Sequence, residues 1–236
     1  MRQGSSLAPV LFSIYVNDLV SDSEVANLGY IFAFADDILL VSLSVVSLQS
    51  MLDTVEKRLN ALNLYINASK SHCLRIGPRY RVECATLTTN DMDELAWSPQ
   101  VRYLGVWISS SRVFKCDFSA ARRSFSRAAN AIFSRVGSTA SEEVVLQLIK
   151  VKCLPILLYG TEAVELSRRD LSALDFSFTR FVMKTFKCSN LGLIREIMVF
   201  MGLDSPSVLV QRRQAKFNRK YSCCKNSLCN DIMMLL

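Results

Sequence analysis

Two short apolar runs near the N-terminus enclose a pair of adjacent acidic residues. Residues 30–35 and 38–41 are aliphatic or aromatic, and Asp36 and Asp37 lie between them. Two runs of strand length around a polar bend predict a buried β-hairpin. Hairpin turns favour Asn-Gly or Asp-Gly, and two like charges beside an apolar core repel each other unless a cation or a donor offsets them. The pattern therefore leaves two interpretations open, a metal site and a solvated turn.

Helical periodicity flanks this hairpin on both sides. Before it, apolar residues recur at helical spacing over residues 7–15, with Pro9 in the first turn, where proline costs no helical hydrogen bond. After it, a second apolar stripe covers residues 48–62, and residues 71–76 alternate as a strand would. The order helix, hairpin, helix, strand predicts an α+β fold in which an antiparallel sheet carries helices on one face.

Two further strands are expected in the middle of the chain. Residues 79–89 and 101–109 are the candidates, and we expect them to pair across the polar stretch between them. The second strand contains Tyr103, Leu104 and Gly105. Because glycine has no side chain, a backbone or a ligand could approach closely at that point, and a bulge in a small hairpin is the alternative.

From residue 111 onward the periodicity is helical. One helix is expected over residues 118–136, with Gly137 as its stop. A Thr139-x-x-Glu142 capping box is expected to start the next, which Pro155 kinks or ends. Ser167 and Asp170 predict another helix start, and Ser205 predicts the cap of a last helix that begins at Pro206. This half of the chain is expected to form a basic helical bundle.

Composition narrows the class of protein. The longest apolar stretch, residues 144–159, is interrupted by Gln147, Lys150, Lys152 and Pro155, so it predicts no membrane span, and no signal peptide opens the chain. The eight cysteines contain no C-x-x-C pair. We therefore expect an intracellular protein, nuclear or cytoplasmic, with reduced thiols, no zinc site and no membrane partner.

Charge divides the chain into an acidic and a basic half. Residues 1–110 contain eight Lys and Arg against eleven Asp and Glu, whereas residues 111–236 contain twenty against ten. A basic half favours a polyanionic partner, because Lys and Arg gain free energy when they release the counterions of phosphates. The alternative is an ordinary solvated basic surface.

Four features together are typical of nucleotidyl transfer, although each is weak alone. They are the acidic pair, a glutamine and a glycine (Gln3 and Gly4) before the first helix, Lys70 after the second, and the basic helices. An ordinary glycine loop is the alternative for Gln3 and Gly4. The reaction uses two divalent ions about 3.5–4 Å apart, held by carboxylates. Since neighbouring strand residues point to opposite faces, Asp36 and Asp37 are expected to need a third acid from elsewhere.

The order of motifs resembles the reverse transcriptases of non-LTR retrotransposons. Residues 2–12 are similar to their R-Q-G-x-x-L-S-P-x-L-F block, and residues 34–37 are similar to their F-A-D-D box. Further along, Asn67-x-x-Lys70-Ser71 looks like an N-x-x-K-[ST] block, residues 103–105 look like a Y-L-G block, and residues 154–162 resemble an L-P-x-L-L-Y-G-x-E stretch of the thumb. These five blocks follow one another in the same order over residues 2–162.

The resemblance implies a fold and a role for each matching residue. It implies a partial palm over residues 1–78, a primer-grip-like β-hairpin over 79–110, and a helical thumb and C-terminal region over 111–236. Asp36 and Asp37 would bind Mg²⁺ in a two-ion site, Lys70 would lie near the triphosphate as a proton donor, and Gln3 and Gly4 would face the incoming nucleotide and the template. Tyr103, Leu104 and Gly105 would support the primer end. Five arginines of the thumb would contact the nucleic-acid backbone: Arg122, Arg123, Arg127, Arg212 and Arg213.

The implied partners are an RNA template, a DNA primer and deoxynucleoside triphosphates. In the family, the block with the first metal-binding aspartate precedes the Gln-Gly block, and residues 1–236 contain no counterpart of it; Asp18 and Asp22 fit a helix end and a polar loop. The chain is therefore expected to be a fragment or truncated product that is inactive by itself. A non-catalytic nucleic-acid-binding module and a retroelement remnant without function remain the alternatives.

Overall fold

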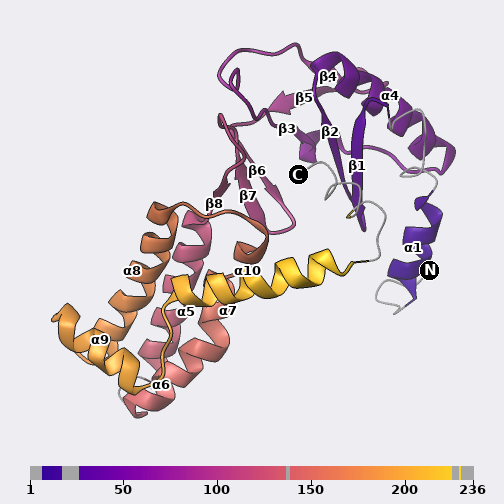
Figure 1. The fold of residues 1–236 in the computed structure, drawn as a ribbon. Coiled ribbons are helices and arrows are strands. Elements are labelled where there is room, and N and C mark those ends of the chain that lie inside the picture. The colour runs from indigo at the N-terminus through magenta and orange to yellow at the C-terminus, as the bar shows by residue number, and fades with distance from the viewer. Residues whose placement is uncertain (1–6, 18–26, 137–138, 225–228, 230–236) are drawn as a thin grey trace. The chain divides into compact units, whose positions relative to one another are not determined.

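The chain forms two compact units in the computed structural model. One comprises Met1–Val101 with Ser110–Phe114, and the other comprises Arg102–Ser109 with Lys115–Leu236. The structure describes residues 7–17, 27–136, 139–224 and 229. Figure 1 shows that the described chain contains both helices and several small sheets, so the α+β class is confirmed.

The first helix of unit 1 has an exposed apolar face. Helix α1 (Ala8–Tyr15) has Pro9 in its first turn, as expected. The hydroxyl of Tyr15 donates a hydrogen bond of 2.8 Å to the carbonyl of Leu62. However, Leu7 and Ile14 are 65% and 66% exposed, so the apolar stripe that predicted the helix is not buried by the described residues.

The acidic hairpin is present, but only one of its faces is covered. Strands β1 (Gly29–Phe34) and β2 (Asp37–Ser42) form an antiparallel two-stranded sheet. Ile31 packs with Met51 and Val55 of helix α4 (Val45–Ala61), whose N-cap is Ser44. On the hairpin's other side, large apolar side chains are exposed: Tyr30, Phe34 and Val41. Apolar residues on both faces are typical of strands that are covered on both sides, which is why the sequence predicted a buried hairpin. Since one face is exposed in the described structure, that prediction is half wrong.

The strand after α4 does not extend this hairpin into one antiparallel sheet. Strand β3 (His72–Cys73) pairs in parallel with β5 (Glu94–Trp97), and β4 (Leu87–Thr88) pairs antiparallel with β5. The expected single antiparallel sheet is thus replaced, in the described residues, by two small sheets, and α4 packs against both. The expected pairing of residues 79–89 with 101–109 is also wrong.

Side chains of α4 replace strand neighbours for the β4 region. The amide of Gln49 pairs with both backbone groups of Thr88, donating to its carbonyl at 2.8 Å and accepting from its N–H at 3.1 Å. Glu56, only 3% exposed, accepts a hydrogen bond of 2.8 Å from the backbone N–H of Asn90. These bonds explain how two-residue strands persist here, since buried backbone groups need partners.

The buried thiol of Cys73 is unreactive at neutral pH. Cys73 packs with Leu52, Leu87 and Leu95. Burial, with a smaller contribution from nearby Cys84, raises the pKa of Cys73 to about 11. Because the thiolate is the form that ligates metals and attacks electrophiles, Cys73 acts as a small core residue at neutral pH.

Unit 2 begins with a small sheet. Strands β6 (Gln100–Tyr103), β7 (Val106–Ser109) and β8 (Cys116–Asp117) are hydrogen-bonded in that order, with the first half of β6 still in unit 1. Residues 101–109, expected as a single strand, are therefore two strands joined by Leu104 and Gly105. Both have positive φ, 46° and 85°, as a two-residue type I′ turn requires.

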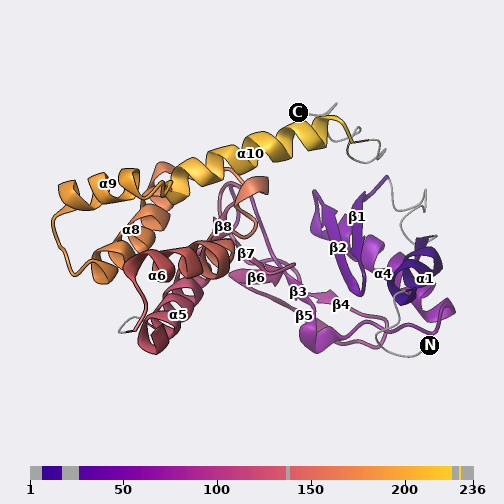
Figure 2. The same ribbon diagram turned by 90° about the horizontal axis from the view of Figure 1, so that it is seen from below.

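The helices of unit 2 enclose the largest apolar core of the described chain. They are α5 (Ser119–Val136), α6 (Glu142–Leu148), α7 (Leu154–Leu157), α8 (Arg168–Thr185), α9 (Leu191–Phe200) and α10 (Pro206–Ser222). Figure 2 shows α5 and α8 within the bundle and α10 running along one side of it. The core gathers side chains that are almost fully buried: Phe125, Ile149, Leu174, Phe178, Ile194 and Val210.

Most of the expected helix signals are confirmed. Ser167 and Asp170 form the capping box of α8, and Ser205 caps α10. The cap of α6 is Ser141 rather than Thr139, because the hydroxyl of Ser141 accepts the hydrogen bond from the N–H of Val144. Gly137, the expected stop of α5, lies outside the described residues.

Pro155 deforms the helix before it, as predicted. A π-helical turn (Ile149–Cys153) separates α6 from α7, and Pro155 lies in the first turn of α7. Proline removes one backbone donor and its ring clashes with the carbonyl four residues earlier, and a wider turn relieves both constraints.

The buried acceptor on α4 generates the first prediction. Replacing Glu56 with leucine leaves the N–H of Asn90 without its partner, and we expect unit 1 to lose about 1–3 kcal/mol of stability. Glu56→Gln keeps an acceptor oxygen and should lose less than half as much. Urea unfolding followed by the fluorescence of Trp97, in a Trp107→Phe background, measures both variants. Equal losses in the two variants would contradict the role of the hydrogen bond.

Candidate functional site

Asp36 and Asp37 lie at the tip of the β1–β2 hairpin. Phe34 and Asp37 are the last paired residues, so Ala35 and Asp36 form the two-residue turn and Asp37 begins β2. Ala35 has a left-handed φ of 51°, a conformation that costs a residue with a Cβ about 1–2 kcal/mol. Both carboxylates are exposed. The hairpin thus presents two adjacent acids to solvent.

These two carboxylates do not complete a metal site with the other described residues. Mg²⁺ prefers six oxygen ligands, of which water and substrate phosphates commonly supply several. In residues 7–17, 27–136, 139–224 and 229, no group of three or more acidic, histidine or cysteine side chains is close enough to hold a metal ion. Asp36 and Asp37 could supply part of a coordination sphere, and the described structure supports no chemical step through a metal.

The described structure does not bring the other residues expected at the nucleotide into contact with Asp36 or Asp37. Lys70 ends a short 3₁₀ helix (Ala68–Lys70), where its N–H donates to the side chain of Asn67 at 3.2 Å, and its amine is exposed. No hydrogen bond or ion pair links Lys70 to either aspartate within the described part of unit 1. Gln3 and Gly4, as well as Asp18 and Asp22, lie outside the described residues.

Two of the sequence blocks meet in unit 2. The hydroxyl of Tyr159 donates a hydrogen bond of 3.0 Å to the carbonyl of Leu104, in the turn formed by residues 103–105, hereafter the 103–105 turn. A Cβ on Gly105 would lie 3.0 Å from Cε1 of Tyr159. The close approach that the glycine permits is therefore made, within this chain, by the ring of Tyr159.

Gly160 continues this contact. It has a φ of 75°, and a Cβ on it would lie 2.6 Å from Cγ2 of Val106. Glycine is required here for two reasons, because the backbone is left-handed and because β7 leaves no room for a side chain. Tyr159 and Gly160 together therefore fit the β6–β7 turn closely.

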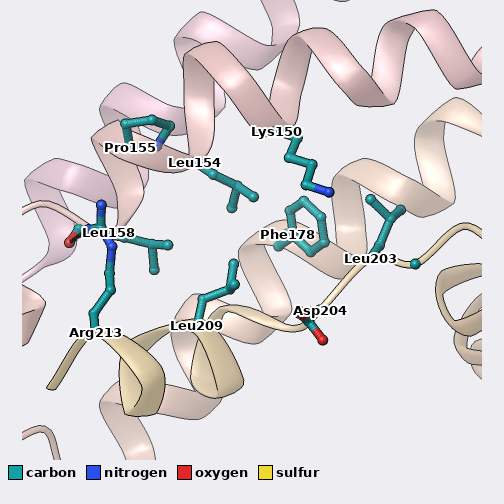
Figure 3. Close-up of a pocket in the computed structure, with 10 residues that line it drawn as sticks. Lys150, Leu154, Pro155, Leu158, Phe178, Leu203, Asp204, Leu209 and Arg213 are labelled. Carbon is teal, nitrogen blue, oxygen red and sulfur yellow. Dashed lines mark hydrogen bonds between the residues drawn. The ribbon is translucent and has the colours of Figure 1, made fainter. Parts of the chain in front are cut away.

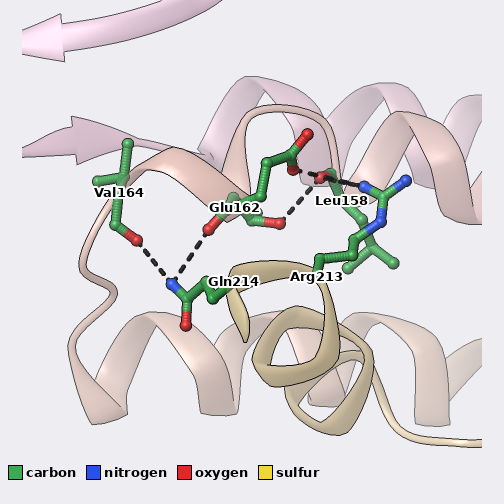
Figure 4. A network of polar contacts seen from close by, with 6 residues as sticks. Leu158, Glu162, Val164, Arg213 and Gln214 are labelled. Carbon is green, nitrogen blue, oxygen red and sulfur yellow. Dashed lines mark hydrogen bonds and ion pairs between the residues drawn. The ribbon is translucent and has the colours of Figure 1, made fainter. Parts of the chain in front are cut away.

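Helix α10 holds the segment that carries these residues, the 158–164 segment. Figure 4 shows Arg213 and Gln214 of α10 reaching its backbone. Arg213 donates to the carbonyl of Leu158 at 2.7 Å, and Gln214 donates to the carbonyls of Thr161 and Val164 at 3.2 and 2.8 Å.

Arg213 also balances a charge. Its guanidinium lies 3.6 Å from Oε2 of Glu162, a buried oxygen for which the described residues supply no hydrogen-bond donor. At that length the contact is an ion pair rather than a hydrogen bond. Removing Arg213 would leave this buried oxygen without its cation.

The basic residues predicted to contact nucleic acid differ in their availability. Arg122 is half-buried, and Arg123 and Arg127 are exposed on α5. Arg212 forms an ion pair with Asp204, and Arg213 is committed to the 158–164 segment. Arg123 and Arg127 also have partners within unit 2, because they donate to the hydroxyls of Ser119 and Ser124 at 3.3 and 3.2 Å. As phosphate contacts, all five residues remain predictions.

The next turns of α10 present cations that were not selected from the sequence. Lys216, Arg219 and Lys220 are exposed, and in the described residues their side chains form no ion pair. Beside them the rings of Phe217 and Tyr221 stack at a centroid distance of 6.0 Å. A run of cations at helical spacing without apolar residues on the same face was the signal that could have identified them.

Cavities occur in both units. In unit 2, a cavity of about 200 Å³ is lined by Leu154, Leu158, Phe178 and Leu209, with the charged groups of Lys150 and Asp204 also drawn around it in Figure 3. Ligand sites usually occupy about 300–1,000 Å³, so this one is small. In unit 1, a cavity of about 460 Å³ is lined by residues that include Arg75, Tyr80, Arg81 and Trp97.

Comparison with known proteins finds a family match over the first part of the chain. Residues 1–108 match the model of the reverse transcriptases (RNA-dependent DNA polymerases). The resemblance to the enzymes of non-LTR elements is also confirmed: the RNA-directed DNA polymerase from mobile element jockey of Drosophila funebris is 29% identical over 133 residues.

The matches cover limited parts of the proteins compared. The similarity to the jockey protein covers 52% of this chain and 14% of that protein. No solved structure matches the chain. Asp36, Asp37, Lys70 and the 103–105 turn all fall within the matched residues 1–108, whereas helices α5 to α10 lie outside them. Among the described helices, none combines the length and the apolar character needed to cross a bilayer.

The contact of Gly160 generates the second prediction. We expect Gly160→Ala to destabilise unit 2 by about 1–3 kcal/mol, because it adds a Cβ against Val106 and places alanine at positive φ. Gly202→Ala is the matched control: its φ is 59°, but no atom lies within 4 Å of the added Cβ. Urea unfolding followed through Trp107, in a Trp97→Phe background, measures both. If the control loses as much as Gly160→Ala, strain alone explains the effect and the close contact is not important.

Proposed function

We propose that this chain is part of an RNA-directed DNA polymerase that extends a DNA primer on an RNA template by two-metal nucleotidyl transfer. The observation that carries the proposal is the exposed pair Asp36 and Asp37 at the tip of a hairpin inside the segment that matches the reverse transcriptases. Divalent ions would activate the primer 3′-hydroxyl and stabilise the triphosphate. This chain would contribute two of the carboxylates.

The proposed role of each residue rests on the family motif that it matches. Asp36, in the turn itself, is the principal metal ligand, and Asp37 is the weaker one. Lys70, with a solvent-exposed amine, would contact the triphosphate and donate a proton to the leaving pyrophosphate. Gln3 and Gly4 would face the nucleotide and the template, and the 103–105 turn would support the primer end.

We further propose that residues 1–236 alone do not catalyse primer extension. Nucleotidyl transfer requires two ions held by several carboxylates, and the described residues bring only Asp36 and Asp37 together. The exposed apolar side chains of α1 and of the hairpin are consistent with surfaces that further polymerase segments would cover.

The third prediction tests this inactivity. With Mg²⁺, deoxynucleoside triphosphates and an RNA template annealed to a labelled DNA primer, the chain should give no more product than its Asp36→Asn variant. A denaturing gel measures extension, and an active reverse transcriptase on the same substrate controls the assay. Product that depends on Asp36 would contradict the proposed inactivity and support the metal role of the hairpin.

A second function, binding of nucleic acid without catalysis, is favoured by the exposed end of α10. Lys216, Arg219 and Lys220 recur at a spacing of three and four residues, so they lie along one side of the helix. Phosphates attract such a row through counterion release, independently of base sequence. We propose that this surface binds the backbone of a primer–template duplex.

The fourth prediction separates this surface from general basicity. Replacing Lys216, Arg219 and Lys220 together with glutamine should weaken binding to an RNA–DNA duplex and lower the slope of log K against log salt by about 2–3 units. The control replaces three exposed arginines elsewhere in unit 2, namely Arg168, Arg169 and Arg195. Fluorescence anisotropy of a labelled duplex gives both quantities. Equal losses in the two triple variants would contradict a localised site, and a wild-type chain that fails to bind at low salt would exclude the function.

A further inference from the structure

The 158–164 segment lies between α10 and the 103–105 turn and makes specific contacts with both. We infer that Tyr159 is a positioning residue for the 103–105 turn, and that Arg213 and Gln214 hold Tyr159 in place. The assignment of that turn to the primer end rests on the proposed function. The contacts themselves lie entirely within unit 2.

The position of Tyr159 is set by directed contacts rather than by burial. Its side chain is 56% exposed, so apolar packing alone leaves the ring free to adopt other rotamers. The bond to the carbonyl of Leu104 and the tight fit against Gly105 together select one orientation. In return, the carbonyl of Leu104, which lies in the turn between β6 and β7, gains a hydrogen-bond donor from Tyr159.

The backbone around Tyr159 is held from the other side by α10. Leu158 and Thr161 are 4% and 0% exposed, so their carbonyls have little access to water. Gln214 donates to the carbonyl of Thr161, a group that would otherwise be costly to bury. Arg213 donates to the carbonyl of Leu158, which also accepts a hydrogen bond of 2.8 Å from the hydroxyl of Thr161, so Arg213 fixes the direction of this carbonyl rather than supplying its only donor. Because Leu158 directly precedes Tyr159, loss of the bond from Arg213 is transmitted to the ring through a single peptide unit.

The same helix carries the cations proposed to bind a duplex. Lys216 follows Arg213 by three residues and Gln214 by two. A duplex bound along Lys216, Arg219 and Lys220 would therefore be connected through α10 and the 158–164 segment to the turn proposed to support its primer end. The positioning role gives Arg213 a function other than phosphate contact.

The fifth prediction concerns the dynamics of the turn in the whole chain. Tyr159→Phe removes one hydroxyl, and amide hydrogen exchange in residues 104–106 should accelerate about fivefold, the factor expected for one hydrogen bond of about 1 kcal/mol. Tyr65→Phe removes a hydroxyl from a side chain that is 75% exposed, and it should leave this exchange unchanged. Unchanged exchange in Tyr159→Phe, with the melting temperature preserved, would overturn the inference.

Variants of α10 test whether Arg213 holds Tyr159 in place, without altering Tyr159 itself. Arg213→Gln should also accelerate exchange in residues 104–106, since it removes the bond to Leu158. Adding Glu162→Gln removes the unpaired buried charge, so it should recover global stability but not the slow exchange of the turn. If the double variant restores slow exchange, charge balance rather than the backbone bond positions the segment, and the role of Arg213 as a donor to Leu158 is wrong.

A labelled primer distinguishes this inference from the proposed function. With 2-aminopurine at the primer 3′ end, duplex binding by the wild-type chain should change its fluorescence, and Tyr159→Phe should reduce this change about twofold or more without altering duplex affinity. If the wild type binds the duplex without any fluorescence change, the proposed role of the turn at the primer end fails, whereas the exchange result still decides the positioning role. A full wild-type signal in Tyr159→Phe would overturn positioning of the primer end by Tyr159.

Discussion

Three hydrogen bonds from α10 to the backbone of the 158–164 segment fix this part of unit 2. Arg213 and Gln214 donate to its carbonyls, and the segment carries Tyr159 and Gly160 against the β6–β7 turn. The carbonyl of Leu158 also accepts the hydroxyl of Thr161, whereas the carbonyl of the buried Thr161 depends on Gln214 among the described residues, and a buried carbonyl without a donor costs about 1–3 kcal/mol. The helical bundle and the small sheet of unit 2 are thereby joined through specific polar contacts as well as through their apolar core.

Unit 1 depends in a comparable way on one helix. The apolar face of α4 covers one side of the β1–β2 hairpin, and its polar residues Gln49 and Glu56 bond the backbone of residues 88–90. The acidic turn lies at the far end of this hairpin and is open to solvent. In the described residues, α1 and one face of the hairpin are among the places where this unit leaves apolar surface uncovered, and both elements fall within the residues that match the reverse transcriptases.

Local signals in the sequence predicted the helices well and the sheets poorly. The caps at Ser167 and Ser205 and the distortion at Pro155 were correct, because each depends on the chemistry of residues within one or two turns. Thr139 was predicted because Glu142 follows it at the capping-box spacing, whereas Ser141, which has Val144 at that spacing, caps α6 through its hydroxyl alone. Strands occur within both 79–89 and 101–109, but their expected pairing was wrong, since the alternation there does not reveal that Leu104 and Gly105 turn the chain or that Gln49 takes the place of a neighbouring strand.

The sequence by itself determined the candidate chemistry: an acidic pair between two apolar runs, a lysine after the second helix, a Tyr-Leu-Gly turn and a basic half, in an order that identified the reverse transcriptases. Those signals are carried by residue types and short spacings, which a chain displays before it folds. Only the tertiary structure decided which side chains are already engaged within the chain and which remain exposed to a partner. It showed that Arg212 and Arg213 are engaged within unit 2, that Lys216, Arg219 and Lys220 are exposed, and that Tyr159 occupies the space beside Gly105. For Arg213 and Tyr159, these contacts join residues 55 positions apart, and no local pattern records them.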